Sequence, residues 1–282
     1  MKLRNRVVVI TGAAAGIGRA SARRFAEAGA TLHLVDRDAE RLEAVALECG
    51  RLGARAAFHV ADCRDLEANR RIAREVLDRD AVVDVLFLNA GIGCGGRVED
   101  LSPDDWRDVL DVNLLGVVHG LDAFLPAMLA QRGGGHVILT ASVLGLFAVP
   151  GVAAYAASKH ALVGLGESLR AEVRHRGIEV TTLCPGLVAT DIVRAAKLHS
   201  GRIDRKGIEA IWDTRGAPPD DVARTVIACV KHRRGGIRIS ASRGTANLWR
   251  LHRLSPRTYE TAMAWVARGL DWLEARAQSR EP

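Results

Sequence analysis

The stretch VVVITGAAAGIGRA at residues 7–20 joins a short apolar run to a glycine-rich turn and then to an amphipathic segment. Residues 7–10 are all apolar and β-branched, which favours a buried strand. The glycines follow the spacing G-x-x-x-G-x-G, and glycine is the residue that allows a tight turn between a strand and a helix. This order predicts the first unit of an alternating α/β fold.

The same alternation continues along the chain. Six more short apolar runs are predicted to be strands, at residues 31–35, 56–60, 83–88, 136–140, 179–183 and 237–239. Helical periodicity separates them, at residues 17–28, 39–51, 65–78, 104–131, 152–176 and 220–231. Alternating strands and helices require parallel strands with crossover helices, so both faces of the sheet are covered. We therefore predict a doubly wound parallel sheet in a three-layer α/β/α arrangement.

Two segments depart from this rhythm. Residues 187–219 form a long polar connection, and such connections more often serve as functional lids than as structural links. Residues 244–282 continue past the last strand as an amphipathic helical C-terminal extension with three tryptophans and several arginines. We predict one domain at residues 1–243, with a substrate lid at 187–219, followed by the extension. Packing of the extension on the domain or across a subunit interface is favoured over peripheral contact with an anionic membrane.

Composition narrows the class of protein. The 282 residues are 48% hydrophobic and 26% charged, a profile typical of a folded globular protein. The net charge of +7 is spread among acidic residues, so we expect no nucleic-acid partner. The five cysteines have no spacing typical of a metal or redox site, and no apolar run is long enough for a signal peptide or a membrane span. We therefore expect a cytoplasmic protein without a metal.

The glycine turn and the second strand together predict a dinucleotide cofactor. Glycines at the start of a helix let backbone N–H groups approach a pyrophosphate. Asp36 follows Gly18 by 18 residues, close to the spacing at which a carboxylate reaches the adenosine ribose. A carboxylate there repels a 2′-phosphate, so we predict NAD, with NADP kept possible because Arg37 partly offsets the repulsion. The alternative is that residues 36–38 only cap the next helix.

Tyr155 and Lys159 are the most informative pair in the chain. The sequence has two tyrosines and five lysines, and these two residues lie four apart in a helical segment, so their side chains share a face. An unperturbed phenol has a pKa of about 10. One positive charge at ~4 Å is worth about 4 kcal/mol, enough to move the pKa of a phenol toward neutrality. The pair therefore predicts a proton-transfer site.

An ordered set of motifs accompanies this pair. They are Thr11-Gly12-x-x-x-Gly16-Ile17-Gly18, Asp62, Asn89-Ala90-Gly91, Asn113, Ser142, Tyr155-x-x-x-Lys159, and Pro185-Gly186 with Thr190. With these motifs, residues 5–240 resemble the single-domain branch of the short-chain dehydrogenase/reductase family. The resemblance implies a Rossmann fold. Leu88 stands where the family often has asparagine, and Ala15 where many NADPH-preferring members carry a basic residue, which supports NAD.

The resemblance also implies a cofactor site. It places Asp62 at the adenine, Asn89 and Gly91 along the cofactor wall, and residues 185–190 around the nicotinamide. The predicted cofactor-binding residues are Thr11, Gly12, Ala15, Gly16, Ile17, Gly18, Asp36, Arg37, Asp62, Cys63, Asn89, Ala90, Gly91, Tyr155, Lys159, Pro185, Gly186, Val188 and Thr190.

The catalytic residues implied by the resemblance are Asn113, Ser142, Tyr155 and Lys159. Tyr155 would exchange a proton with the substrate as hydride moves to or from the nicotinamide. Ser142 would stabilise the substrate oxygen, and Lys159 would lower the pKa of the phenol and hold the ribose. Asn113 would anchor a water that links Lys159 to solvent. Ser142, Leu144 and Tyr155 are the predicted substrate contacts.

The predicted reaction interconverts a secondary alcohol and a ketone. Residues 143–150 are mostly apolar, which favours a hydrophobic substrate. Two alternatives stay open at this point: an NADPH-dependent 3-oxoacyl-type reductase, and a redox sensor that binds dinucleotide without turnover. Helices at 104–131 and 152–176 resemble those that pair in the family, so we expect a homodimer or homotetramer.

Overall fold

Seven parallel strands form the central sheet in the computed structural model, which describes residues 2–199, 209–210, 212, 214–241 and 245–278. The strands are β1 (Val7–Thr11), β2 (Thr31–Asp36), β3 (Ala56–Val60), β4 (Val85–Leu88), β6 (Gly135–Thr140), β7 (Ile178–Pro185) and β9 (Gly236–Ser240). Their order is β3-β2-β1-β4-β6-β7-β9. The direction of winding reverses between β1 and β4, which opens a crevice at their carboxyl ends. The predicted doubly wound parallel sheet is confirmed.

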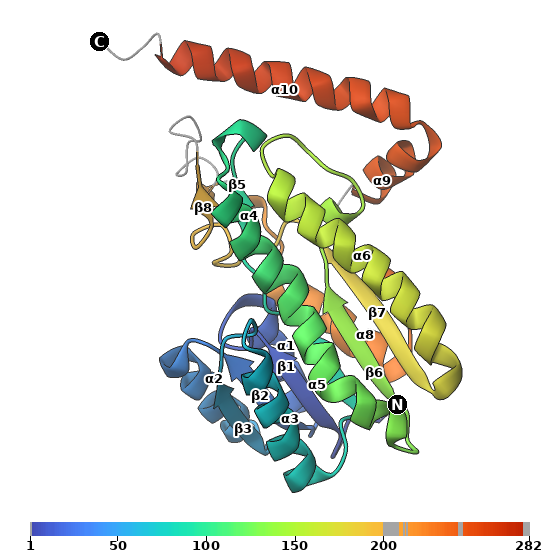
Figure 1. Cartoon of the computed structure of the whole chain (residues 1–282). Coiled ribbons are helices and arrows are strands. Elements are labelled where there is room, and N and C mark those ends of the chain that lie inside the picture. The colour runs from blue at the N-terminus through green and yellow to red at the C-terminus, as the bar shows by residue number, and fades with distance from the viewer. Residues whose placement is uncertain (1, 200–208, 211, 213, 242–244, 279–282) are drawn as a thin grey trace.

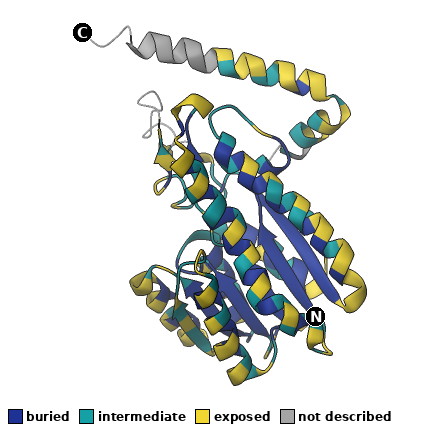
Figure 2. Ribbon diagram, viewed as in Figure 1, coloured by how far each residue is buried: buried dark blue, intermediate teal, exposed yellow. Residues whose placement is uncertain are grey.

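Helices cover both faces of this sheet (Figure 1). The helices that follow the first strands are α1 (Gly16–Glu27), α2 (Ala39–Arg51) and α3 (Leu66–Asp80), and those in the second half are α4 (Pro103–Leu110), α5 (Gly116–Ala130), α6 (Ala153–Val173) and α8 (Pro219–His232). Phe25 of α1, Leu42 of α2 and Val226 of α8 share one buried cluster. Ile72 of α3 and Phe124 of α5 belong to another, on the opposite face of the sheet. The strands between them are buried except at β3, β9 and Asp36, the last residue of β2 (Figure 2).

The stretch between α4 and α5 differs from the single regular helix expected at 104–131. α4 begins at a capping box, in which Ser102 accepts from the backbone N–H of Asp105 and the Asp105 carboxylate accepts from that of Ser102. A π-helical turn, η2 (Asp111–Leu115), then leads into α5. π turns occur often at functional sites, and this one contains Asn113, which is fully buried.

Among the described residues, the run Pro103–Ala130 is long and apolar enough to cross a membrane by length and composition alone. The sequence analysis expected no such run, and in this respect it is wrong. Part of the run is buried against the protein, where α5 packs on α3 and Phe124 reaches the core. Packing inside the fold therefore accounts for the apolar residues of the run that are buried.

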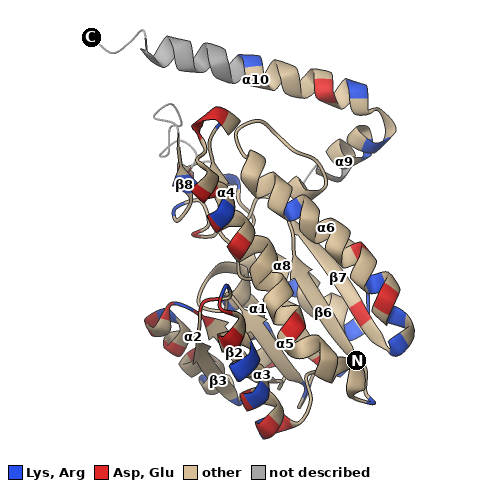
Figure 3. Ribbon diagram, viewed as in Figure 1, with Lys and Arg blue, Asp and Glu red and all other residues tan. Residues whose placement is uncertain are grey.

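Short elements lie at the carboxyl edge of the sheet. β5 (Cys94–Gly95) pairs in parallel with β8 (Lys197–Leu198), and single 3₁₀ turns form η1 (Val98–Asp100) and η3 (Val143–Gly145). A further 3₁₀ turn, η4 (Arg174–Arg176), lies at the opposite edge, between α6 and the start of β7. Of the predicted lid at 187–219, residues 200–208, 211 and 213 lie outside the described residues. Lysine and arginine residues lie among acidic residues along α2, α3 and α6 (Figure 3).

The C-terminal extension consists of α9 (Thr245–Leu254) and α10 (Pro256–Gln278). Figure 1 shows α10 leading away from the body of the domain. The predicted apolar stripe of the extension includes Trp272, whose side chain lies outside the described residues. Tyr259, near the start of α10, is buried in the main core cluster.

Candidate active site

The glycine turn lies at the carboxyl end of β1, beside the crevice. Gly12 and Gly16 have φ angles of +66° and +51°, in the region that favours glycine. A Cβ atom on Gly18 would lie 2.0 Å from the carbonyl oxygen of Gly12. A Cβ on Gly12 would lie 2.8 Å from Cα of Ala90, at the end of β4. A side chain at position 12 or 18 would clash with backbone atoms, so the motif requires glycine there.

The start of α1 differs from the starts of α2, α3 and α4. α2, α3 and α4 are capped by the side chains of Asp38, Asp65 and Ser102, which accept from backbone N–H groups of the first turn. At the N-cap of α1 stands Ala15, and no side chain in the described part of the chain caps this helix. The first turn of α1 contains no acidic residue. Its N–H groups are therefore available to an anion, which fits the pyrophosphate of a dinucleotide.

Asn89 holds the glycine turn against the neighbouring strands. Its side-chain amide donates to the carbonyls of Thr11 and Gly12, both at 3.2 Å, and accepts from the Thr140 hydroxyl at 3.2 Å. The Thr11 hydroxyl in turn accepts from the backbone N–H groups of Asn89 and Ala90. These contacts make Asn89 and Thr11 positioning residues for the turn.

Asp36 points toward the same turn. Its carboxylate accepts from the backbone N–H of Ala14 at 3.0 Å and from that of Asp38 at 3.1 Å. The N-cap of α2 is Asp38, so the Asp36 carboxylate does not cap that helix. It lies beside the glycine turn instead. Arg37, the next residue, is exposed. A carboxylate at this place is suited to bind two ribose hydroxyls.

Asp62 is held by a residue that the sequence analysis did not single out. Arg64 binds both carboxylate oxygens of Asp62, at 2.7–3.1 Å, and its backbone N–H donates to the same group. The hydrogen bonds from the Arg64 side chain hold the pKa of Asp62 below its usual value. Cys63 is half-buried, and burial raises the pKa of its thiol to about 11, so it stays neutral. No sequence motif marks Arg64; only its two-residue spacing from Asp62 hints at the pair.

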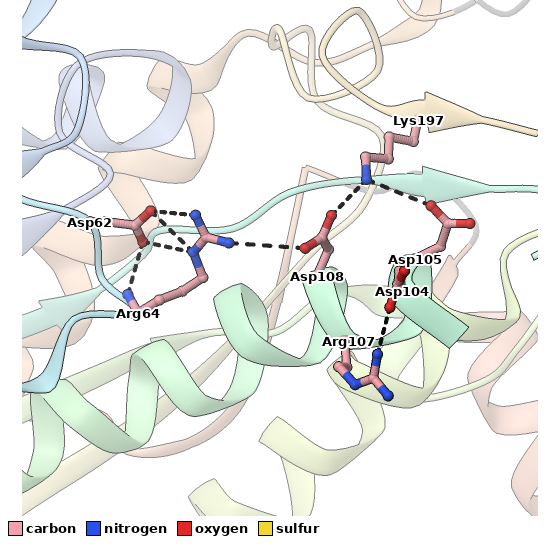
Figure 4. Close-up of polar contacts among 7 residues, drawn as sticks. All are labelled: Asp62, Arg64, Asp104, Asp105, Arg107, Asp108 and Lys197. Carbon is pink, nitrogen blue, oxygen red and sulfur yellow. Dashed lines mark hydrogen bonds and ion pairs between the residues drawn. The ribbon is translucent and has the colours of Figure 1, made fainter. Parts of the chain in front are cut away.

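Arg64 continues into a chain of ion pairs (Figure 4). Its guanidinium lies 3.9 Å from Asp108 of α4, and Asp108 lies 2.6 Å from the ammonium of Lys197 in β8. Lys197 also lies 3.6 Å from Asp105. The chain links the turn after β3, where the adenine is expected, to the first described part of the predicted lid.

Ser142, Tyr155 and Lys159 come together at the carboxyl end of β6. Ser142 follows the strand, and its hydroxyl accepts from the backbone N–H of Leu144 at 3.1 Å. Lys159 is 2% exposed, donates to the carbonyl of Thr140 at 2.9 Å, and lies 5.5 Å from the centre of the Tyr155 ring. The two residues of α6 share one face of the helix, as their spacing predicts.

The electrostatics of the pair differ from the sequence-based expectation. Burial raises the pKa of Tyr155 to about 12, and a hydrogen bond with Ser142 acts in the opposite direction. Burial also lowers the pKa of Lys159 to about 8. The expectation that Lys159 alone brings the phenol near neutrality is therefore wrong for this chain. The cost of removing the phenolate from water is the largest influence on the pKa of Tyr155.

Asn113 is joined to the site through backbone contacts. Its amide accepts from the N–H of Ile92 at 2.8 Å and donates to the carbonyl of Ile92 and to the hydroxyl of Ser158, at 3.1 and 3.0 Å. Ser158 donates to the carbonyl of Tyr155 at 2.7 Å. A Cβ on Gly91 would lie 3.1 Å from the Asn113 amide oxygen and 3.4 Å from the Lys159 ammonium. Asn113, Lys159 and Gly91 therefore share one wall, and the water-anchoring role of Asn113 stays a prediction.

The segment after β7 lies across the glycine turn. Gly186, which follows Pro185, donates its N–H to Ser240 at 2.9 Å, and Val188 forms a bridge with residue 217. The methyl group of Thr190 would lie 3.0 Å from a Cβ on Gly16. The structure thus brings the two ends of the predicted cofactor site together. Asp191 also pairs with Arg41 of α2 at 3.4 Å, a contact without a signal in the sequence.

Comparisons with known proteins agree with this geometry. The family model described as short chain dehydrogenase matches residues 6–200. An uncharacterized oxidoreductase of Listeria monocytogenes is 36% identical over 228 residues, which are 80% of this chain and 90% of the relative.

Two solved structures are similar over most of their length. A short chain dehydrogenase/reductase from Burkholderia phymatum in complex with NAD has a TM-score of 0.84 and 30% identity, and the match covers 92% of this chain and 96% of that one. An alcohol dehydrogenase from the archaeon Thermococcus sibiricus, complexed with 5-hydroxy-NADP, has a TM-score of 0.74 and 30% identity, covering 84% and 97%.

Proposed function

The chain belongs to the short chain dehydrogenase family and is an oxidoreductase of that family, and from this premise we propose that it interconverts secondary alcohols and ketones on hydrophobic substrates, with NAD as its preferred cofactor. The resemblance drawn from the motifs is confirmed. One observation carries the proposed reaction: Ser142, Tyr155 and Lys159 meet at the carboxyl end of β6, on the wall that also contains Gly91.

The residues that would hold the dinucleotide are the uncapped start of α1, Asp36, the 89–91 turn and Lys159. When bound, the nicotinamide would accept or supply the hydride. The preference for NAD is supported by the Asp36 carboxylate, which lies at the glycine turn and would repel a 2′-phosphate.

Proton transfer is the task of Tyr155. With its pKa raised to about 12, the phenol is protonated at neutral pH and ready to donate to a ketone oxygen. Ser142 is hydrogen-bonded to Tyr155, so its hydroxyl and the phenol can both approach the same substrate oxygen. Removal of a proton from an alcohol needs the ionised phenol. We therefore expect alcohol oxidation to accelerate as pH rises above neutrality, and ketone reduction to slow.

The test measures turnover with defined probes. Cyclohexanol and 2-decanol are offered with NAD or NADP, and the matching ketones with the reduced cofactors, while the absorbance of reduced nicotinamide is followed. Tyr155→Phe is expected to bind NADH like the wild type and to lose at least about 100-fold in kcat, the typical worth of a general acid. Activity retained in this variant would refute the mechanism.

Two other outcomes would favour the alternatives. NADH binding by a wild type that turns over none of the probes would favour a dinucleotide sensor. Preference for NADPH together with a 3-oxoacyl thioester would favour a 3-oxoacyl-type reductase.

We also propose that copies of the chain associate through the outer faces of α5 and α6. Leu115, the last residue of η2, and Val118 of α5 are 43% and 38% exposed. Exposed apolar side chains on a long helix are suited to a symmetric interface. Light scattering on the purified chain would give the mass, and a monomer would refute this proposal.

A further inference from the structure

The segment at residues 143–150 joins two groups of the candidate active site. Ser142 precedes it, and Tyr155 follows it by a few residues. At its start, η3 lies against α6: a Cβ on Gly145 would be 2.4 Å from the carbonyl oxygen of Lys159. After its end, Gly151 accepts from the N–H of Gly96 at 2.9 Å. Both ends are fixed by the domain itself, so the path between them depends on what holds the middle.

The middle of the segment is held by the C-terminal extension. Tyr259 of α10 is 5% exposed and donates its O–H to the carbonyl oxygen of Ala148. Its ring meets the ring of Phe147 edge to face, with 6.1 Å between centroids and 60° between planes. Phe147 is itself buried at 4% exposure. One side chain thus binds both the backbone and the aromatic group of the segment.

Tyr259 is supported from its own side. The ring of His252 in α9 packs against it at 4.8 Å and 78°, and Trp249 and Met263 pack on the same core cluster. Farther along α10, Trp265 is 67% exposed. Much of the described part of α10 is exposed (Figure 2). The contact between the extension and the domain therefore centres on Tyr259.

We propose that the C-terminal extension forms part of the active-site wall, and that Tyr259 is a positioning residue that determines which substrates fit. By holding Phe147 and Ala148, it sets the path of the chain between η3 and Gly151, the stretch that joins Ser142 to Tyr155. Ser142 and Tyr155 are placed by β6 and α6 and do not depend on this contact. Loss of the contact should therefore change how well a long apolar substrate is held and leave the chemical step unchanged. This inference rests on the proposed function.

Tyr259→Phe is the direct test, because it removes one O–H and keeps the ring. A hydrogen bond of this kind is worth about 0.5–1.5 kcal/mol, so KM for 2-decanol should rise about two- to tenfold. KM for cyclohexanol, kcat for both probes and the Kd of NADH should stay within about twofold of the wild type. The matched control is Trp265→Phe, an exposed aromatic on the same helix, which should change none of these values.

A second measurement does not need turnover. Hydrogen exchange of the backbone amides at 143–150 should accelerate in Tyr259→Phe and not in Trp265→Phe, because the carbonyl of Ala148 loses its partner. If the wild type turns over no probe, the proposed function is refuted, but the exchange data still test the contact between Tyr259 and Ala148. Unchanged hydrogen exchange in Tyr259→Phe would overturn the inference. A fall in kcat that is equal for both alcohols would overturn it as well.

Discussion

Replacing Lys159 by methionine should make the protein more stable and nearly inactive. The ammonium is 2% exposed, and burial lowers its pKa from 10.5 to about 8. The lysine is therefore still charged at pH 7, but its charge is less favourable in the folded chain than in the unfolded one. The difference between the two pKa values corresponds to about 3 kcal/mol of lost stability.

The sign of the pH dependence follows from the lowered pKa. Below pH 8 both states are protonated and the full cost is present. Between pH 8 and 10.5 the folded state releases the proton first, so stability rises with pH and the cost disappears. Methionine removes the charge at every pH. It also removes the hydrogen bond to Thr140, worth about 1 kcal/mol, so the net gain at pH 7 is about 2 kcal/mol.

The same substitution should lower activity although it raises stability. At 5.5 Å from the Tyr155 ring centre, the ammonium attracts a phenolate by about 3 kcal/mol at an effective dielectric of ~20. Without it, kcat/KM for cyclohexanol oxidation should fall at least about 100-fold, since every 1.4 kcal/mol is a factor of ten.

Urea unfolding at pH 7 and pH 10, with a rate assay, would measure both effects. Lys231→Met on α8 is the matched control, because that lysine is exposed and its replacement should change neither quantity by much. A Lys159→Met variant that is less stable at pH 7 and keeps more than a tenth of the activity would refute the reasoning.

Three further predictions follow from other parts of the structure. Asp36→Asn keeps an acceptor for the glycine turn but removes the charge, so KM for NADP should fall about tenfold relative to KM for NAD. Lys197→Met breaks the ion pair with Asp108, so KM for NAD or alcohol should rise about two- to fivefold. The KM of this variant should also change less with added salt than that of the wild type. The rings of His33 and His59 are stacked at 5.3 Å and burial lowers the pKa of both, so the protein should lose stability as pH falls below 6.5; His59→Gln should reduce that loss by about 1 kcal/mol.

Each of these has a control. For Asp36→Asn, thermal unfolding should match the wild type, and unchanged cofactor preference in a stable variant would show that the carboxylate does not face the ribose. For Lys197→Met, an Asp108→Asn partner in a double-mutant cycle should show non-additive KM changes; additivity would disprove the coupling. For His59→Gln, acid unfolding that follows the wild-type curve would show that the stacked pair is not its cause.

The strands and the helices around them could be predicted from the sequence because their signals are local. A run such as residues 7–10 is apolar at every position because both faces of the sheet are covered, and the glycine spacing follows from a backbone contact between Gly12 and Gly18. The Tyr155–Lys159 spacing places both side chains on one face of α6 whatever else the chain does. The caps of α2 and α4 are local as well, at Asp38 and Ser102.

What the sequence by itself determined was the fold class, the glycine turn and the shared helix face of Tyr155 and Lys159, since periodicity, glycine spacing and helical phase act over a few residues. Only the tertiary structure showed that burial is the largest influence on the pKa of Tyr155, because desolvation depends on everything packed around the phenol. The link from Arg64 to Lys197 and the contact of Tyr259 with Ala148 join residues more than a hundred positions apart. No short-range sequence pattern predicts such pairs, because each partner taken alone looks like an ordinary surface or helix residue.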